Sequence, residues 1–320
     1  MQLASVLSPL SRENLRLAAQ CGVEAIVTRY PGPGLDRLEE IQARIASEGL
    51  SLLAVEGFLP IERIKLGTDH DGEDVEEVKD LIRNLGKLGI PLLCTNFMAG
   101  TDWVRTSVEA PERGGARVTA FRLADAETAV SLSETTSGLA DDTQVSAEVL
   151  WNRLEAFLLE ILPVAEACGV TVTMHPDDPP IPTFRNKARI LNSVEAFERL
   201  VELVPSPSNA ICFCVGTFVA MGVSIPDAIR RLGPHIRYVH FRDVRGTAND
   251  FAETFHDNGP TDMVAVMRAL REAGFNGPIR PDHVPQMEGE FDGDPGYTML
   301  GRLFAYGYIR GLVKATEPLR

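Results

Sequence analysis

The fold is decided by three short β-rich segments, AICFC (210–214), IRYVHF (236–241) and PIRPDH (278–283). Each segment is followed by a longer stretch in which apolar residues recur with the period of an amphipathic helix, such as DMVAVMRALREAGF. Strands that alternate with helices in this way are typical of parallel βα units. The carboxyl-terminal half of the chain therefore predicts a parallel sheet covered by helices.

The same alternation extends back to the start of the chain. Five further strands are predicted at QLASVL (2–7), EAIVT (24–28), SLLAVE (51–56), PLLCTN (91–96) and VTVTMH (170–175). Eight strands, each followed by a helix, predict an α/β fold, a single (β/α)₈ TIM barrel over residues 1–320.

Local signals support the helices and argue against the main alternative fold. Ser11 is a predicted N-cap, Gly22 a predicted end of the first helix, and residues 35–47 repeat the helical pattern before Gly49. An open doubly wound sheet is the runner-up architecture. Neither a G-x-G-x-x-G after the first strand nor a P-loop lysine motif supports it.

A long insertion follows the fourth predicted strand. Residues 97–145 are rich in Gly, Ser, Thr and charge, and they are too numerous for a plain βα connection. In a barrel this segment leaves the carboxyl-terminal face, where active sites lie. We expect a lid or substrate-contacting excursion, and the competing interpretation is a flexible, disordered decoration.

Composition narrows the function classes. The 320 residues carry a formal net charge of −14, which opposes binding to nucleic acid or to an anionic membrane surface. No apolar run reaches the roughly 20 residues that span a bilayer, and the amino terminus lacks a secretory signal, so we expect a cytoplasmic protein. The five cysteines are few and odd in number, as expected of reduced thiols rather than a disulfide framework.

Potential metal ligands stand at the ends of four consecutive predicted strands. These are His175, Cys214, His240 and the adjacent pair Asp282 and His283. The last inward-facing side chains of neighbouring barrel strands converge at the mouth. Two imidazoles, a thiolate and a carboxylate suit one divalent transition metal, although each residue alone is more often structural.

Strand alternation refines this set. Cys212 shares the face of Cys214 but lies about 6 to 7 Å deeper in the barrel, so Cys214 is the favoured ligand. Asp282 and His283 cannot both follow the same pleat, so one can bind metal while the other reaches substrate. A structural zinc site with all four positions filled by the protein is the alternative. The mouth of a barrel does not need a metal for its stability, so a site with an open coordination position is favoured.

Other polar residues near the predicted strand ends are candidate substrate contacts. The segment HPDDPP (175–180) places Asp177 and Asp178 beside His175, where they orient a ligand, contact substrate hydroxyls or only form a turn. Arg105 could clamp a carboxylate with its two-pronged guanidinium. The remaining candidates at the mouth are Asn96, Arg242 and His256, whereas Arg280 is expected to pair inside the barrel.

Several longer motifs resemble one known family. They run in family order and include CTNFMAGTDWVRT (94–106), HPDDPP, FCVGT (213–217), VHFRDV (239–244), DFAETFHDNGPTDMVAVMRAL (250–270), RPDHVPQM (280–287) and GYTMLGRLFAYGYIRGL (296–312). With these motifs the chain resembles bacterial D-mannonate dehydratases, metal-dependent barrels of the xylose-isomerase-like superfamily. HPDDPP and RPDH are the specific motifs among them.

The resemblance implies a function and a site. It places the metal on His175, Cys214, His240 and Asp282, names Mn²⁺ or Fe²⁺ as the cofactor, and assigns acid/base roles to His283 and Tyr297. The implied reaction converts D-mannonate to 2-dehydro-3-deoxy-D-gluconate in hexuronate degradation, and a homodimer or higher homo-oligomer is expected. Without the resemblance, Tyr297 reads equally well as a packing residue.

The sequence also departs from the family. The first strand lacks the usual Arg-Trp pair, position 243 is Asp rather than Asn, residues after HPDDPP lack a Gly-Leu-Pro, and Asp257 and Val284-Pro285 replace the usual residues. Three alternatives therefore stay open: a dehydratase for a related sugar acid, a sugar isomerase or epimerase of the same superfamily, and a barrel that binds a sugar acid without turnover.

Overall fold

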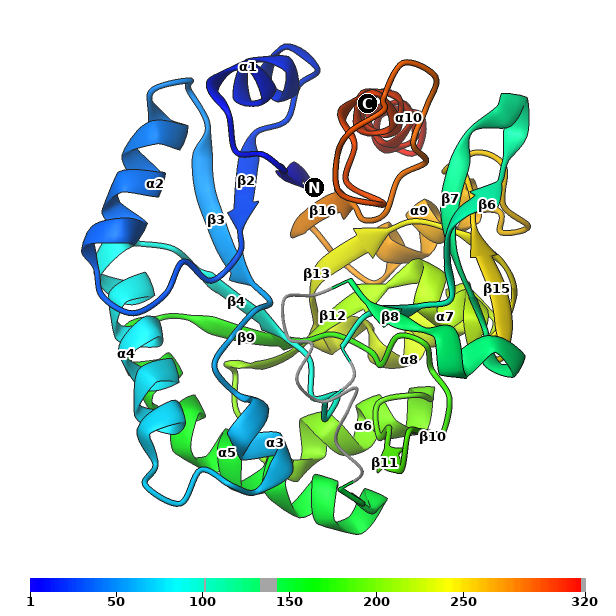
Figure 1. Ribbon diagram of the computed structural model, residues 1–320. Helices are drawn as coiled ribbons and strands as arrows, with labels where there is room; N and C mark the ends of the chain where they lie inside the picture. The colour runs from blue at the N-terminus through cyan, green and yellow to red at the C-terminus, as the bar shows by residue number, and fades with distance from the viewer. Residues whose placement is uncertain (101, 133–142, 318–320) are drawn as a thin grey trace.

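Eight parallel strands form a closed barrel in a computed structural model, which describes residues 1–100, 102–132 and 143–317 (Figure 1). Around the barrel they follow the order β1-β16-β13-β12-β9-β4-β3-β2. The strands are β1 (Gln2–Val6), β2 (Ala25–Thr28), β3 (Ser51–Glu56), β4 (Leu92–Thr95), β9 (Thr171–Met174), β12 (Asn209–Cys214), β13 (Ile236–Phe241) and β16 (Pro278–Pro281). This confirms the predicted (β/α)₈ barrel, which closes where β1 pairs with β16.

Helices surround the barrel and follow each of its strands in the chain (Figure 1). They are α1 (Arg12–Gln20), α2 (Asp36–Ala46), α3 (Glu62–Leu66), α4 (Glu73–Leu88), α5 (Ala147–Cys168), α6 (Val194–Leu203), α7 (Val215–Ala220), α8 (Ile225–Leu232), α9 (Met263–Glu272) and α10 (Met299–Ala315). Ser11 caps α1 as predicted, because its hydroxyl accepts from the Asn14 backbone N–H at 3.1 Å. No helix in the described ranges is both long and apolar enough to cross a membrane.

The core has an outer and an inner part. The outer part fills the space between the strands and the helices with large apolar side chains, as Leu15, Ile45 and Phe197 illustrate. The inner part, inside the barrel, combines small residues such as Ala4 and Ala25 with larger ones such as Tyr238. Because side chains fill the interior, the barrel is not a pore, and its open space lies at the carboxyl-terminal mouth.

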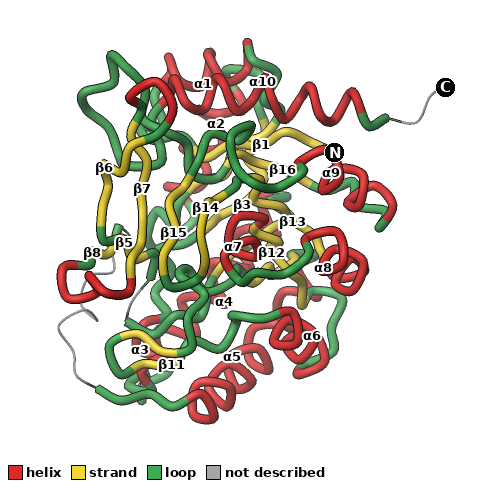
Figure 2. Tube along the Cα trace, turned by 90° about the vertical axis from the view of Figure 1, so that its right-hand side faces the viewer, coloured by secondary structure: helices red, strands yellow, loops and turns green. Residues whose placement is uncertain are grey.

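The long segment after β4 builds a second, antiparallel sheet. It contributes β6 (Ser107–Pro111) and β7 (Arg117–Arg122) to this sheet. The same segment also forms a separate two-stranded sheet from β5 (Val104–Arg105) and β8 (Val130–Ser131), and it has 3₁₀ turns at Arg113–Gly115 and Leu123–Thr128. The loop after β13 adds β14 (Val244–Thr247) and β15 (Asp250–Glu253), which gives the order β14-β15-β7-β6. Figure 2 shows these strands side by side along one flank of the molecule.

This added sheet corrects one of the two interpretations of residues 97–145. Disordered decoration is wrong for the parts that form β5 to β8, since their backbones pair with one another and with β15. Residues 133–142 and residue 101 lie outside the described residues. The role of the insertion as a lid stays a prediction. Two further short elements are the antiparallel pair of β10 (Thr183–Phe184) with β11 (Lys187–Ala188) and the 3₁₀ turn Gly233–His235.

Candidate metal centre and active site

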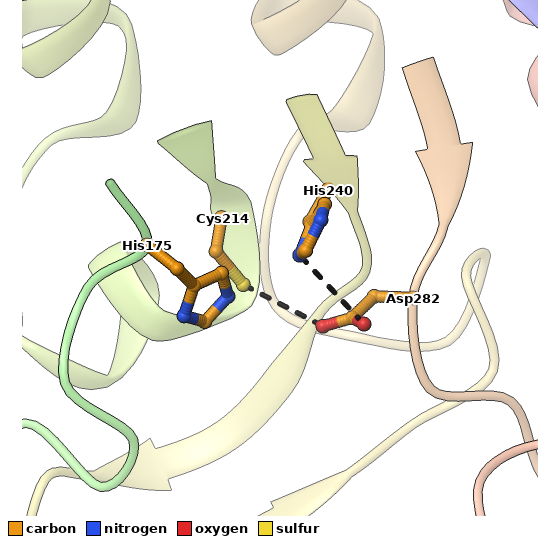
Figure 3. Close-up of side chains that lie close together, drawn as sticks. All are labelled: His175, Cys214, His240 and Asp282. Carbon is orange, nitrogen blue, oxygen red and sulfur yellow. Dashed lines mark hydrogen bonds and ion pairs between the residues drawn. The ribbon is translucent and has the colours of Figure 1, made fainter. Parts of the chain in front are cut away.

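The four predicted metal ligands meet at the carboxyl-terminal mouth of the barrel (Figure 3). Cys214 ends β12 and is the register partner of His240 on β13, while His175 and Asp282 directly follow β9 and β16. One donor atom from each residue lies within 4.8 Å of the others. The Cys214 Sγ is 3.7 Å from Asp282 Oδ2, and His240 Nδ1 is 3.8 Å from Asp282 Oδ1. The strand-end reasoning therefore selected residues that the fold brings together.

Charged neighbours keep Asp282 ionised. Arg242 Nε donates to its Oδ2 at 2.7 Å, and Arg280 Nη2 lies 3.0 Å from its Oδ1. Burial raises the pKa of Asp282, but the charges of His283, Arg280, His240 and Arg242 outweigh it and hold that pKa well below its usual value. The carboxylate is thus available as an anionic ligand at neutral pH.

Glu56 at the end of β3 is a second carboxylate behind the ligands. Its Oε2 accepts from Tyr238 Oη at 2.9 Å and from His240 Nε2 at 3.1 Å, and its Oε1 accepts from Arg280 Nη2 at 2.6 Å. Arg29 Nη1 adds a further contact at 2.9 Å. A carboxylate that accepts from one imidazole nitrogen leaves the other nitrogen free to bind a metal. Glu56 therefore directs His240 Nδ1 toward Asp282.

His283 is fixed at the mouth by a stack and a hydrogen bond. Its ring stacks on Trp103 with centroids 4.4 Å apart, and its Nδ1 donates to Glu253 Oε1 at 2.6 Å. Burial lowers the pKa of His283, against the opposing effect of the Asp282 and Glu253 carboxylates, so the neutral ring is favoured. With Nδ1 protonated and turned to Glu253, Nε2 is the acceptor nitrogen.

Tyr297 lies beside His283, immediately before the N-cap Thr298 of α10. Its ring centroid is 5.6 Å from that of His283 and 5.4 Å from that of Trp103, in edge-on orientations. The guanidinium of Arg29 lies 5.0 Å from the Tyr297 ring centroid. The two residues that the family resemblance names for acid/base roles are therefore neighbours at one mouth.

A cavity at the mouth of the barrel opens onto these side chains. Its described lining combines the ligands, the acid/base candidates and residues from the other strand ends: Arg29, Glu56, Gly57, Phe58, Cys94, Thr95, Asn96, Asp102, Trp103, His175, Asp178, His240, Arg280, Asp282, His283 and Tyr297. Cys214 lies just beneath this lining and is fully buried.

The predicted substrate contacts divide into two groups. Asn96 lines the cavity, and its Oδ1 accepts from Lys65 Nζ at 3.3 Å. Asp177 is buried outside the described lining, where its Oδ2 accepts from the Leu191 backbone N–H at 2.8 Å. His256 is also buried outside that lining, and burial lowers its pKa to about 4. Contact of Asp177 and His256 with substrate stays a prediction without direct support from this geometry.

Arg105 and Arg242 bind carboxylates of the chain itself. Arg105 forms a two-pronged pair with Asp178, at 2.8 and 2.9 Å, and also reaches Glu253 at 2.7 Å. Arg242 bridges Asp282 and Asp178. Neither guanidinium belongs to the described cavity lining, so both fix the residues around the site rather than face a ligand here.

Sequence reasoning missed several residues of the cavity. Arg29 and Glu56 stand at the carboxyl ends of the second and third strands, so the strand-end rule applied to histidine and cysteine would have found them. Asp178, rather than Asp177, faces the cavity. No local sequence pattern indicated that Trp103 belongs to the site, because its stacking partner His283 is far away in the chain. Arg280 does pair inside the barrel as predicted, and it also lines the cavity.

Three of the departures from the family pattern, Asp243, Asp257 and Val284, lie outside the described cavity lining. Asp243 accepts from the backbone N–H and hydroxyl of Thr261, and Asp257 pairs with Arg113. These differences therefore leave the ligands and the acid/base candidates in place.

Comparisons with known proteins agree with this site. The family described as D-mannonate dehydratase (UxuA) matches residues 9–319. A mannonate dehydratase of Oceanobacillus iheyensis is 33% identical over 301 residues, covering 88% of this chain and 86% of the relative. The crystal structure of mannonate dehydratase from Streptococcus suis superimposes with a TM-score of 0.89 at 30% identity, covering 99% and 93% of the two chains. A D-psicose 3-epimerase shares only the fold, at 14% identity and a TM-score of 0.65. The chain therefore belongs to the D-mannonate dehydratase family.

Proposed function

We propose that this chain removes water from D-mannonate at the cavity described above, giving 2-dehydro-3-deoxy-D-gluconate. Family membership identifies it as a hydro-lyase and decides against the isomerase and epimerase alternatives. The observation that carries the proposal is the meeting of four metal-binding side chains with His283 and Tyr297 at one cavity.

The four-ligand set fits a first-row divalent transition ion. Mg²⁺ and Ca²⁺ prefer oxygen ligands, so the two imidazoles and the thiolate argue against them. The carboxylate argues against a soft ion, which prefers sulfur ligands. We propose Mn²⁺ or Fe²⁺ held by His175, Cys214, His240 and Asp282. When bound, such an ion supplies positive charge that polarises a substrate oxygen and stabilises the negative charge that develops beside the carboxylate.

His283 is the proposed base. Its Nδ1 is held by Glu253 at 2.6 Å, so the neutral ring presents an unprotonated Nε2, which can take the proton from C2 of the substrate. Stacking on Trp103 holds the ring in this orientation. Tyr297 is then the proposed acid, whose hydroxyl gives a proton to the departing C3 hydroxyl.

The substrate carboxylate needs a cationic partner that is not already buried. Among the arginines of the described lining, Arg280 is 1% exposed, whereas the Arg29 side chain is 27% exposed. We propose that Arg29 takes the role that the sequence suggested for Arg105, and that Asn96 binds a substrate hydroxyl.

Turnover of the purified protein on D-mannonate tests the proposal. We expect a 2-keto-3-deoxy acid, detected by its carbonyl chemistry, with added Mn²⁺ or Fe²⁺, and no product after chelation. If the metal-loaded protein yields no product from D-mannonate but dehydrates another sugar acid, the substrate assignment is wrong.

Isotope exchange separates the two acid/base roles. In D₂O, Tyr297→Phe should lose turnover but still exchange the C2 hydrogen of D-mannonate, because the base is intact. His283→Asn should lose both turnover and exchange. If His283→Asn still exchanges the C2 hydrogen and Tyr297→Phe does not, then Tyr297 is the base and His283 is the acid.

A further inference from the structure

A second group of metal-binding side chains lies deeper in the barrel. One donor atom each from Cys94 on β4, Cys212 on β12 and His240 on β13 lies within 4.8 Å of the others, and all three residues are buried. We call this group the inner thiol site. It shares His240 with the four-ligand site but contains neither His175, Cys214 nor a carboxylate.

The two thiols of the inner thiol site are badly placed for a disulfide. β4 and β12 both pair with β9, which lies between them (Figure 1). Two strand spacings separate their backbones by about 9 Å. A disulfide needs Cα atoms about 4.4 to 6.8 Å apart, so its formation would require the barrel to deform. A bridging cation spans more, because each metal–sulfur bond adds about 2.3 Å.

We propose that the inner thiol site binds Cu⁺. Two thiolates and an imidazole form a soft donor set, which selects Cu⁺ over the harder divalent ions, and the set lacks the carboxylate that characterises the four-ligand site. A route for the ion also exists. Cys94 and His240 line the cavity, so an ion that enters the mouth reaches both before it meets Cys212 beneath them.

Occupation of the inner thiol site withdraws a ligand from the four-ligand site. A neutral imidazole has a single acceptor nitrogen, so His240 can bind one cation at a time. Cu⁺ on His240 therefore weakens retention of the divalent ion. Coordination of Cu⁺ by two thiolates is independent of the proposed reaction, whereas the accompanying loss of turnover rests on it.

X-ray absorption of copper in the Mn²⁺-loaded protein tests the site. After one equivalent of Cu⁺ is added anaerobically, we expect two sulfur ligands per copper and release of bound Mn²⁺. Cys212→Ser should leave at most one sulfur ligand and weaken Cu⁺ binding about tenfold or more. Cys21→Ser, which removes a half-buried cysteine at the end of α1, is the matched control and should keep two sulfur ligands.

Three results would overturn the proposal. A single sulfur ligand in the unaltered protein would place copper at Cys214, and unchanged coordination in Cys212→Ser would exclude the inner thiol site. Full retention of Mn²⁺ beside copper with two sulfur ligands would exclude the sharing of His240. If Cys212→Ser does not fold, as judged by its melting curve without metal, Cys94→Ser provides the same comparison.

Discussion

Glu56 shows how one side chain outside the ligand set can control the metal. It is buried at the end of β3, and it accepts hydrogen bonds from His240, Tyr238 and two arginines. A carboxylate in this position fixes the tautomer and the orientation of a metal-binding imidazole.

Substitution of Glu56 by Gln should weaken metal binding. Gln can donate as well as accept, so it no longer fixes the proton on His240 Nε2, and we expect the dissociation constant for Mn²⁺ to rise about 10- to 100-fold. Titration of the metal-free protein followed by calorimetry measures this change. Glu109→Gln removes an exposed ion pair with Arg117 and is the control. Equal affinities in both variants would show that Glu56 does not direct His240.

Glu253 predicts how stability depends on pH. Burial raises its pKa, but Arg242 and His283 outweigh burial, so the pKa falls from 4.5 to about 2 in the folded chain. A depressed pKa means that the carboxylate stabilises the fold above pH 4.5, and that this contribution disappears as the pH falls from 4.5 toward 2. Its size is on the order of 3 kcal/mol at neutral pH.

Denaturant unfolding of Glu253→Gln at several pH values tests this dependence. The variant should be less stable than the unaltered protein at pH 7, and the two free energies of unfolding should converge as the pH falls below 4.5. A difference that stays constant over this range would contradict the assigned pKa.

At the scale of elements, the added sheet supports the active-site histidine. β15 places Phe251 and Glu253 on one face, because side chains two apart in a strand point the same way. Phe251 contacts Phe121 of β7, with centroids 6.0 Å apart, and Arg105 lies over the Phe251 ring. The packing of β7 on β15 therefore positions the carboxylate that holds His283.

Phe121→Ala should weaken this support. Loss of a fully buried ring costs about 3 kcal/mol or more in the free energy of unfolding, and a looser β15 should also lower kcat. Urea unfolding and steady-state kinetics measure the two effects. Val130→Ala, at a half-exposed position on β8, should change stability by no more than about 0.5 kcal/mol. If folded Phe121→Ala has the kcat of the unaltered protein, the added sheet does not support catalysis, and the prediction is wrong.

At the scale of the whole molecule, the ligands come from half of the barrel. β9, β12, β13 and β16 are consecutive around the closed sheet, so one bound cation connects four strands. A ligand that binds only the folded state stabilises it, by about 2.7 kcal/mol at a free concentration of 100 times the dissociation constant.

Mn²⁺ should therefore raise the melting temperature of the unaltered protein, and chelation should reverse the effect. Cys214→Ala removes one ligand and should abolish most of this dependence. Scanning calorimetry of both proteins, with and without Mn²⁺, gives the comparison. A melting temperature that is insensitive to Mn²⁺ in both would argue against the site. The expected homo-oligomer stays a prediction that light scattering can test.

The barrel could be predicted from the sequence because its signals are local. Each strand and each helix carries its own periodicity, and ends of parallel strands meet by topology alone, which is why Cys214 and His240 were found. The added sheet could not be predicted, because β7 pairs with a strand about 130 residues away. The pairing of Arg105 with Asp178 was missed for the same reason, because the two residues are distant in the chain. Glu56 could have been placed at the mouth by its strand end, but its contact with His240 is likewise between distant residues.

The most direct test is an anomalous difference map from crystals of the Mn²⁺-loaded protein. We predict one strong peak within bonding distance of His175, Cys214, His240 and Asp282. The crystals should come from a protein preparation that is fully loaded with Mn²⁺ and active in solution. A map from such crystals without a peak among these four side chains would contradict the proposed metal centre.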